Sequence, residues 1–170
     1  IDWNDRLIGI KGTRGVGKTT FLLQYAKEKF GTDRSCLFIN MNNFYFSGHS
    51  IVDFAYEFQR RGGKVLLIDQ VFKHPDWSKE LRLCYDRFPN LKIVFTGSSV
   101  MRLKEENLEL RDIVKSYNLR GFSFREYLNL QTGMKFRCYS LEEILSNHEQ
   151  IAKGILSKVR PLDYFQDYMH

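Results

Sequence analysis

The chain of 170 residues is 43% hydrophobic and 15% aromatic, which suits one domain with a full core and excludes an intrinsically disordered chain. No apolar run approaches the roughly 18 residues of a membrane span, and no signal peptide is recognisable, so we expect no membrane partner. The net charge of +6 favours an anionic ligand, but the basic residues are spread along the chain and form no nucleic-acid-binding motif.

The first predicted elements are a strand, a glycine-rich loop and a helix. Arg6–Lys11 has the apolar run of a short buried strand, and the apolar spacing of Thr19–Phe30 predicts a helix. The loop Gly12–Thr20 reads G-T-R-G-V-G-K-T-T and fits G-x-x-x-x-G-K-[ST], the phosphate-binding loop of nucleoside triphosphatases. A preceding strand and a following helix are the context in which this pattern binds phosphate.

The residue types in this loop suit a triphosphate with a bound magnesium ion. Glycines let backbone N–H groups turn toward an anion, and the start of a helix offers further unpaired N–H groups. We expect the Lys18 ammonium to reach the β- and γ-phosphates and the Thr19 hydroxyl to coordinate Mg²⁺. The predicted nucleotide-binding residues are Gly12, Thr13, Arg14, Gly15, Val16, Gly17, Lys18, Thr19 and Thr20.

Strands and helices continue to alternate after the loop. Ser35–Asn40 is predicted as a buried strand, Met41–Ser50 as a loop and Ile51–Arg61 as a helix. A third strand follows from Lys64 and ends at Asp69. An apolar run that ends in an acid is common, but after a phosphate loop it delivers a carboxylate to Mg²⁺, so we predict Asp69 as the second metal-binding residue.

The fourth predicted strand carries hydroxyl groups at its carboxyl end. A helix is predicted from Pro75 to Phe88, and the strand Leu91–Thr96 then leads into Gly97-Ser98-Ser99. Because ligands of α/β sheets bind beyond the carboxyl ends of the strands, Ser98 is a candidate to contact a γ-phosphate or an attacking water. The alternative is that Ser98 or Ser99 caps the N-terminus of a helix.

The remaining chain is predicted to be mainly helical. Leu103–Arg111 is charged and expected to be exposed, and Ser116–Arg120 is the fifth predicted strand. Ser123 and Glu126 have the spacing of a capping box at the start of a helix. Helical patterning returns in the segments 141–145, 151–159 and 162–169. The alternation predicts a mostly parallel sheet covered on both faces, followed by a helical tail.

The three cysteines predict no metal or disulfide site. Cys36, Cys84 and Cys138 are far apart and form no C-x-x-C pair, and the four histidines have no metal-ligand spacing. Reduced thiols are the default for such cysteines, so we expect a cytoplasmic protein.

Taken together, these motifs resemble prokaryotic AAA-like P-loop ATPases related to the signal-transducing ATPases. The resemblance covers the chain from Arg6 to Leu130, and besides the phosphate loop it rests on Leu67-Ile68-Asp69, Lys73-His74-Pro75-Asp76-Trp77, Tyr85-Asp86, Ile93–Ser99 and Gly121–Leu128. It implies a three-layer α/β/α fold of the ASCE class with strand order 5-1-4-3-2. It also implies an ATPase core in residues 1–130, with residues 131–170 as a helical lid or the start of a following segment.

The resemblance further implies a longer protein with a C-terminal domain. A chain that opens on Ile1 rather than Met is what an excised piece would show. A homo-oligomer is a further expectation, since a neighbouring protomer often supplies an arginine finger. Arg111 matches a position where relatives have a Gly-Arg pair, although Leu110 replaces the glycine here and an exposed helix charge is an equal alternative.

Gln70 is the main departure from the family's pattern. Relatives have a glutamate there that orients and helps to deprotonate the attacking water. Glutamine holds water by hydrogen bonds but accepts no proton, and loss of a general base costs about 10²–10⁴ in rate. Asn42 and Asn43 likewise stand where relatives often have paired aspartates. The sequence leaves open whether Gln70 marks a paralogue specialised for binding or a substitution that traps bound ATP.

The leading interpretation is therefore an Mg²⁺·ATP-binding ATPase domain that switches conformation with nucleotide state and hydrolyses ATP slowly. The predicted catalytic residues are Lys18, Asp69, Gln70 and Ser98, with Thr96 as the alternative to Ser98. A non-catalytic, nucleotide-dependent module that binds a partner or nucleic acid is the alternative. A small-molecule kinase is a weaker option because no acceptor pocket is recognisable. ATP is preferred to GTP because the chain has no N-K-x-D motif.

Overall fold

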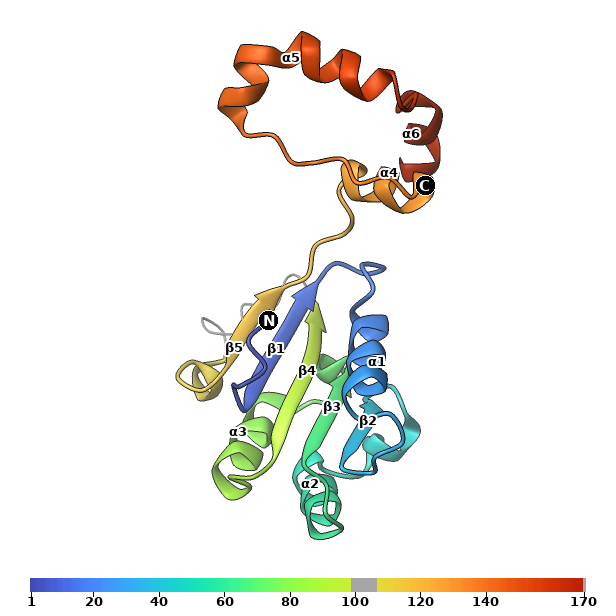
Figure 1. Cartoon of the computed structure of the whole chain (residues 1–170). Helices are drawn as coiled ribbons and strands as arrows, with labels where there is room; N and C mark the ends of the chain where they lie inside the picture. Colours follow the sequence, from blue (N-terminus) through green and yellow to red (C-terminus); the bar gives the residue numbers. More distant parts are fainter. Residues whose placement is uncertain (99–106, 170) are drawn as a thin grey trace. The chain divides into compact units, whose positions relative to one another are not determined.

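The computed structural model describes residues 1–98 and 107–169, which form two compact units (Figure 1). The first unit is Ile1–Gly121, and the second begins at Phe122. The chain thus divides just before the predicted capping box at Ser123, and the helix that follows groups with the later helices. None of the helices in the described parts of the chain has the length and apolar character of a membrane span.

The first unit is built on a five-stranded sheet in which every pair of neighbours is parallel. Its strands are β1 (Leu7–Gly12), β2 (Cys36–Asn40), β3 (Val65–Asp69), β4 (Lys92–Ser98) and β5 (Lys115–Asn118). The order β2-β3-β4-β1-β5 is the predicted order 5-1-4-3-2 read in reverse, so that prediction is confirmed. Because Asn40 pairs with Asp69 and Gly12 with Ser98 in the register, the carboxyl ends of β1 to β4 lie along one edge of the sheet.

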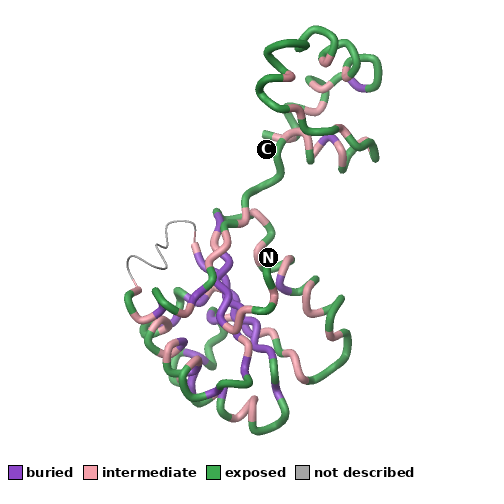
Figure 2. The backbone as a smooth tube through the Cα atoms, turned by 60° about the vertical axis from the view of Figure 1, so that its left-hand side comes forward, coloured by how far each residue is buried: buried purple, intermediate pink, exposed green. Residues whose placement is uncertain are grey.

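Helices cover both faces of the sheet, as predicted. Strand residues alternate between two hydrophobic clusters: in β3, for example, Leu66 and Ile68 belong to one cluster, and Val65 and Leu67 to the other. The first cluster packs under α2 (Ile51–Arg60) and α3 (Trp77–Arg87), and the second packs under α1 (Lys18–Lys29). Figure 2 shows the buried residues concentrated in the strands between these layers. Burial on both faces explains why the central strands are continuous apolar runs.

Three sequence expectations for this unit are wrong in part. The strand at Ser35–Asn40 was expected to be buried, but β2 is an edge strand on which Leu37 is 37% exposed. The loop Met41–Ser50 contains a short 3₁₀ turn, η1 (Phe44–Ser47), that buries Phe46. Leu103–Arg111 was expected to be exposed, but Leu110 in the 3₁₀ turn η3 (Leu108–Leu110) is fully buried because it joins the core beside α3.

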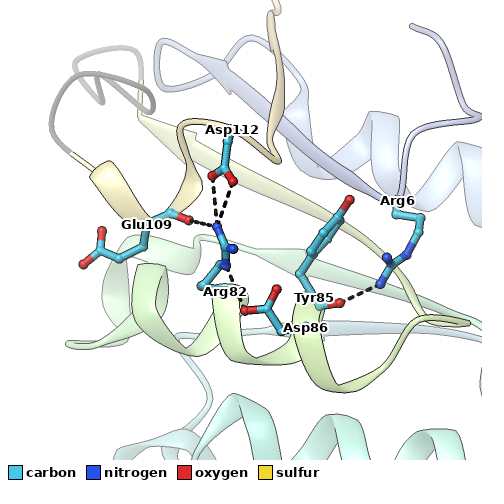
Figure 3. A network of polar contacts seen from close by, with 6 residues as sticks. All are labelled: Arg6, Arg82, Tyr85, Asp86, Glu109 and Asp112. Atoms are coloured by element: carbon cyan, nitrogen blue, oxygen red, sulfur yellow. Dashed lines mark hydrogen bonds and ion pairs between the residues drawn. The ribbon is translucent and has the colours of Figure 1, made fainter.

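A polar network fastens α3 to its neighbours (Figure 3). The Arg82 guanidinium donates hydrogen bonds to Asp86 on the same helix, and to the Glu109 carbonyl and the Asp112 carboxylate on the segment that precedes β5. At the C-terminal end of α3, Arg6 donates to the Tyr85 and Phe88 carbonyls and lies over the Tyr85 ring. These contacts anchor the helix that follows the β3 loop.

The second unit consists of three helices: α4 (Phe124–Thr132), α5 (Leu141–Leu156) and α6 (Leu162–Met169). The predicted capping box of Ser123 and Glu126 is present at the start of α4. α4 packs against α6 through the rings of Phe124 and Phe165. The predicted segments 141–145 and 151–159 fall in one helix with a kink at Asn147, up to Leu156. The role of residues 131–170 as a lid or linking segment stays a prediction.

Candidate functional site

The glycine loop between β1 and α1 requires glycine for two different reasons. Gly15 and Gly17 have φ values of 86° and 89°, in the left-handed region that side chains rarely adopt, while a Cβ at either would meet no atom within 4 Å. A Cβ at Gly12 would instead lie 2.4 Å from the Leu119 carbonyl oxygen. The backbone conformation therefore requires glycine at positions 15 and 17, and the lack of room for a Cβ requires it at position 12. Gly17 is also the residue from which α1 starts, so unpaired helix N–H groups follow it.

Lys18 lies against this loop rather than extending into solvent. Its ammonium donates to the Gly12 carbonyl at 2.9 Å and to the Thr13 carbonyl at 2.7 Å. Partial burial lowers the pKa of Lys18, and the Asp69 carboxylate opposes that shift. An anion beside this ammonium would offset the cost of its desolvation, as a phosphate would.

Asp69, at the end of β3, is held by three hydrogen bonds and is 1% exposed. Its Oδ2 accepts from the Thr19 hydroxyl at 2.9 Å and from the Asn40 amide at 3.0 Å. Its Oδ1 accepts from the Thr96 hydroxyl at 2.5 Å. A buried carboxylate with this many donors is fixed in one orientation, and here the orientation is toward Thr19 at the start of α1.

The pair Thr19 and Asp69 suits a magnesium ion. Both supply the hard oxygen donors that Mg²⁺ prefers, and Mg²⁺ commonly takes one or two protein ligands with the rest from phosphate and water. The described residues contain no group of three or more His, Cys, Asp or Glu that would hold a metal alone. A metal at this pair would thus depend on phosphate oxygens, which matches a site for a nucleotide complex.

Gln70 has an unusual backbone conformation directly after Asp69. Its φ of 56° and ψ of 44° make it the one non-glycine residue with positive φ among those described. Such a conformation is disfavoured for a residue with a Cβ and persists only where its surroundings hold it. Here the Gln70 N–H donates to the Thr96 hydroxyl at 2.9 Å. Thr96 thereby holds both the Asp69 carboxylate and the turn that starts the 3₁₀ segment η2 (Val71–Lys73).

These elements surround a cavity of about 700 Å³ at the carboxyl edge of the sheet. Its lining residues are Gly12, Arg14, Gly15, Gly17, Lys18, Thr19, Thr20, Asn42, Asp69, Gln70, Phe72, Lys73, Gly97 and Ser98. Of the predicted loop residues, Thr13 and Val16 are not in this lining. Thr13 instead provides a carbonyl for Lys18, and the Val16 side chain lies beside Gly12 and Gly121. Predicted residues from three separate segments therefore border one cavity.

The structure distinguishes the two candidate hydroxyls on β4. Ser98 borders the cavity, whereas Thr96 is fully buried and makes hydrogen bonds with Asp69 and Gln70. The alternative that Ser98 or Ser99 caps a helix falls on a segment, 99–106, outside the described residues. Arg111 is exposed at the end of η3 and is not in the cavity lining.

Sequence reasoning missed Asn40 and the double role of Thr96. Asn40 ends β2 directly opposite Asp69 in the strand register, and its side chain accepts from the Asn42 N–H while donating to Asp69. A polar residue at the carboxyl end of the strand beside Asp69 was the available signal. For Thr96, no sequence pattern indicates a hydrogen bond to a backbone N–H.

Comparisons with known proteins agree with this fold. The AAA domain family matches residues 4–128 of the chain. The chain is 31% identical over 169 aligned residues to the uncharacterised protein MJ1637 of Methanocaldococcus jannaschii; the match covers 92% of this chain and 35% of that protein, so this chain spans about a third of its relative. The structure of C. elegans PCH-2 is similar with a TM-score of 0.51 and 18% identity, over 75% of this chain and 38% of PCH-2, which shows a common fold.

Proposed function

Because the chain belongs to the AAA domain family, whose members are nucleotide-binding, ATPase-like domains, we propose that its first unit binds Mg²⁺·ATP and slowly hydrolyses it to ADP and phosphate. The observation that carries the proposal is the hydrogen bond between Thr19 and Asp69, with Lys18 on the same cavity wall. A phosphate loop, an oriented carboxylate and a cavity bordered by both are the parts that phosphoryl transfer requires.

The predicted site residues at the cavity each have a proposed role. The loop N–H groups and Lys18 bind the phosphates, and Thr19 and Asp69 hold Mg²⁺, which when bound neutralises charge on the phosphate oxygens. Ser98 contacts the γ-phosphate, and Gln70 orients the attacking water by hydrogen bonds. Gln70 has no carboxylate to take the proton, so the rate is expected to be about 10²–10⁴ lower than with glutamate.

The wider setting of the domain is also a proposal. We propose that nucleotide state switches the conformation of the chain, that the helical unit is a lid or leads into a C-terminal domain, and that copies of the chain assemble with one another. The greater length of the relative MJ1637 supports a longer protein. Three free cysteines support a cytoplasmic location, since disulfides are rare there.

The alternative function is a non-catalytic module that binds nucleotide and signals its presence to a partner or a nucleic acid. The single observation that favours it is Gln70 at the position where the family has a glutamate. In this alternative the phosphate loop and Asp69 keep their binding roles, and only hydrolysis is absent.

Nucleotide binding is tested by thermal unfolding with ATP and Mg²⁺. At 100 times Kd, bound nucleotide adds about 2.7 kcal/mol to the free energy of unfolding, so the melting temperature rises by several degrees. Lys18→Ala is expected to abolish the shift, and Lys79→Ala, on the exposed side of α3 and outside the cavity lining, is expected to retain it. Absence of a shift in the unmodified protein at millimolar ATP contradicts the proposal.

A further inference from the structure

Besides Arg14 and Lys18 of the phosphate loop, the cavity is bordered by a third cationic residue, Lys73, which lies on a different segment. Lys73 ends η2, three residues after Gln70 on the chain segment that follows β3. Lys18 and Arg14 border the same cavity from the segment that follows β1, and β4 lies between the two strands. The cavity is therefore flanked by positive side chains from two different segments.

The positive charge at the cavity exceeds the negative charge. Among the described residues of its lining, Arg14, Lys18 and Lys73 are cationic and Asp69 alone is acidic. The Asp69 carboxylate already accepts three hydrogen bonds, and Gln70 supplies no second carboxylate. An excess of positive charge in a concave site attracts an anion.

Lys73 has no acidic partner among the described residues. No Asp or Glu oxygen in the described ranges lies within ion-pair distance of its ammonium, which instead lies 5.8 Å from the centroid of the Phe72 ring. Lys79, six residues further along, is paired with Asp76 at 3.4 Å. The ammonium of Lys73 is thus available to an incoming anion, whereas that of Lys79 is engaged.

On the premise that the proposed function holds, we propose that Lys73 is a substrate-binding cation that contacts the terminal phosphate of a nucleoside triphosphate. The segment that carries Lys73 begins with Asp69 and Gln70, the residues at the metal and water end of the site. The Lys73 ammonium is therefore placed to contact the terminal phosphate rather than the base or the α-phosphate. Lys73 makes the site prefer ATP to ADP, because ADP has no phosphate at that end.

The preference is tested by calorimetric titration of the whole chain with ATP and with ADP, each with Mg²⁺, at low and moderate salt. Lys73→Gln is expected to weaken ATP binding about tenfold and to change ADP binding less than about twofold, since a charge-assisted contact is lost with one ligand only. Lys73→Arg retains the ATP preference because it retains the charge. Lys79→Gln, which also removes an exposed charge but outside the cavity lining, leaves both affinities unchanged.

The outcomes separate this inference from the proposed function. If the unmodified protein binds ATP and Lys18→Ala does not, but Lys73→Gln lowers neither affinity or lowers both equally, the role of Lys73 is refuted and the ATP site remains. If the unmodified protein binds neither nucleotide, both proposals are refuted together. Because Lys73 is exposed, the melting temperature of the nucleotide-free variant is expected to equal that of the parent, which excludes misfolding as the cause of weaker binding.

Discussion

The Thr19 hydroxyl donates a hydrogen bond to Asp69 Oδ2 at 2.9 Å, although 50 residues separate the two along the chain. The parallel sheet brings them together, because α1 starts beyond β1 and Asp69 ends β3 at the same edge. The fold thus holds the two oxygen donors at hydrogen-bond distance from each other. A metal ion bound here would take the Thr19 and Asp69 oxygens as ligands in place of the hydrogen bond between them.

Asp69→Asn is expected to remove the dependence of ATP affinity on Mg²⁺. The amide keeps the size of the side chain but lacks the negative charge of the carboxylate ligands that bind Mg²⁺, so the contribution of Mg²⁺ to ATP affinity is expected to be lost. The measurement is ATP affinity by fluorescence titration with Mg²⁺ and with excess EDTA. The parent is expected to bind ATP more tightly with Mg²⁺, and the variant equally under both conditions. A variant that still responds to Mg²⁺ as the parent does would show that the metal lies elsewhere.

Gln70→Glu is expected to raise the single-turnover rate of ATP hydrolysis by about 10²–10⁴, because it supplies the missing general base at a position that borders the cavity. Gln70→Ala, which removes the water-orienting amide as well, serves as the matched control and is expected to be slower than the parent. The assay follows release of phosphate with enzyme in excess over ATP. If ATP binds and neither the parent nor Gln70→Glu turns over, the non-catalytic module becomes the better account.

The individual strands and the phosphate loop followed from the sequence because both depend on local signals, whereas the sheet order followed only from the resemblance to a known family. Apolar runs, the two loop glycines with positive φ and the acid at the end of β3 each report on their own segment. The partial exposure of β2 and the burial of Leu110 did not follow from local signals, because they depend on which segments pack beside them. The same reason explains Asn40: its side chain matters only because β2 pairs with β3 in this register.

The backbone of Gln70 marks a second limit of sequence reasoning. The sequence shows only a change of side-chain chemistry at this position. The structure adds a left-handed backbone and a hydrogen bond from its N–H to Thr96, neither of which a residue type reveals. The chemistry of a site can thus be inferred from its residue types, while the groups that hold it in place require the fold.

Glu80 on α3 is expected to stabilise the start of α2 and the segment that follows η2. Its carboxylate accepts from the Ile51 N–H at 2.5 Å, at the start of α2, and lies 3.1 Å from the ring of His74, which follows η2. Glu80→Ala leaves the N–H of a fully buried residue unpaired, so we expect the free energy of unfolding to fall by about 1–3 kcal/mol. The free energy of unfolding is measured by urea denaturation.

The matched control for Glu80 is Glu57→Ala. Among the described residues, the Glu57 carboxylate on α2 forms only exposed ion pairs, with Arg60 and Arg61. Glu57→Ala is therefore expected to lower the free energy of unfolding by about 0–1 kcal/mol. If both variants lose the same free energy of unfolding, the Glu80 contacts stabilise the protein no more than a surface ion pair does. Glu80→Gln keeps an acceptor for the Ile51 N–H, so its free energy of unfolding is expected to lie between those of Glu80→Ala and Glu57→Ala.

Thr96→Val is expected to impair both stability and magnesium-linked binding, because one hydroxyl serves two partners. Valine keeps the shape but leaves the Gln70 N–H unpaired and removes a donor to Asp69, at a cost of about 1–3 kcal/mol in unfolding free energy. Thr96→Ser keeps the hydroxyl and is expected to restore the Mg²⁺ response of ATP affinity. A purely packing role for Thr96 predicts the reverse order, with valine close to the parent and serine worse, since serine lacks the buried methyl group. Urea unfolding and ATP titration on the same three proteins decide between the two roles.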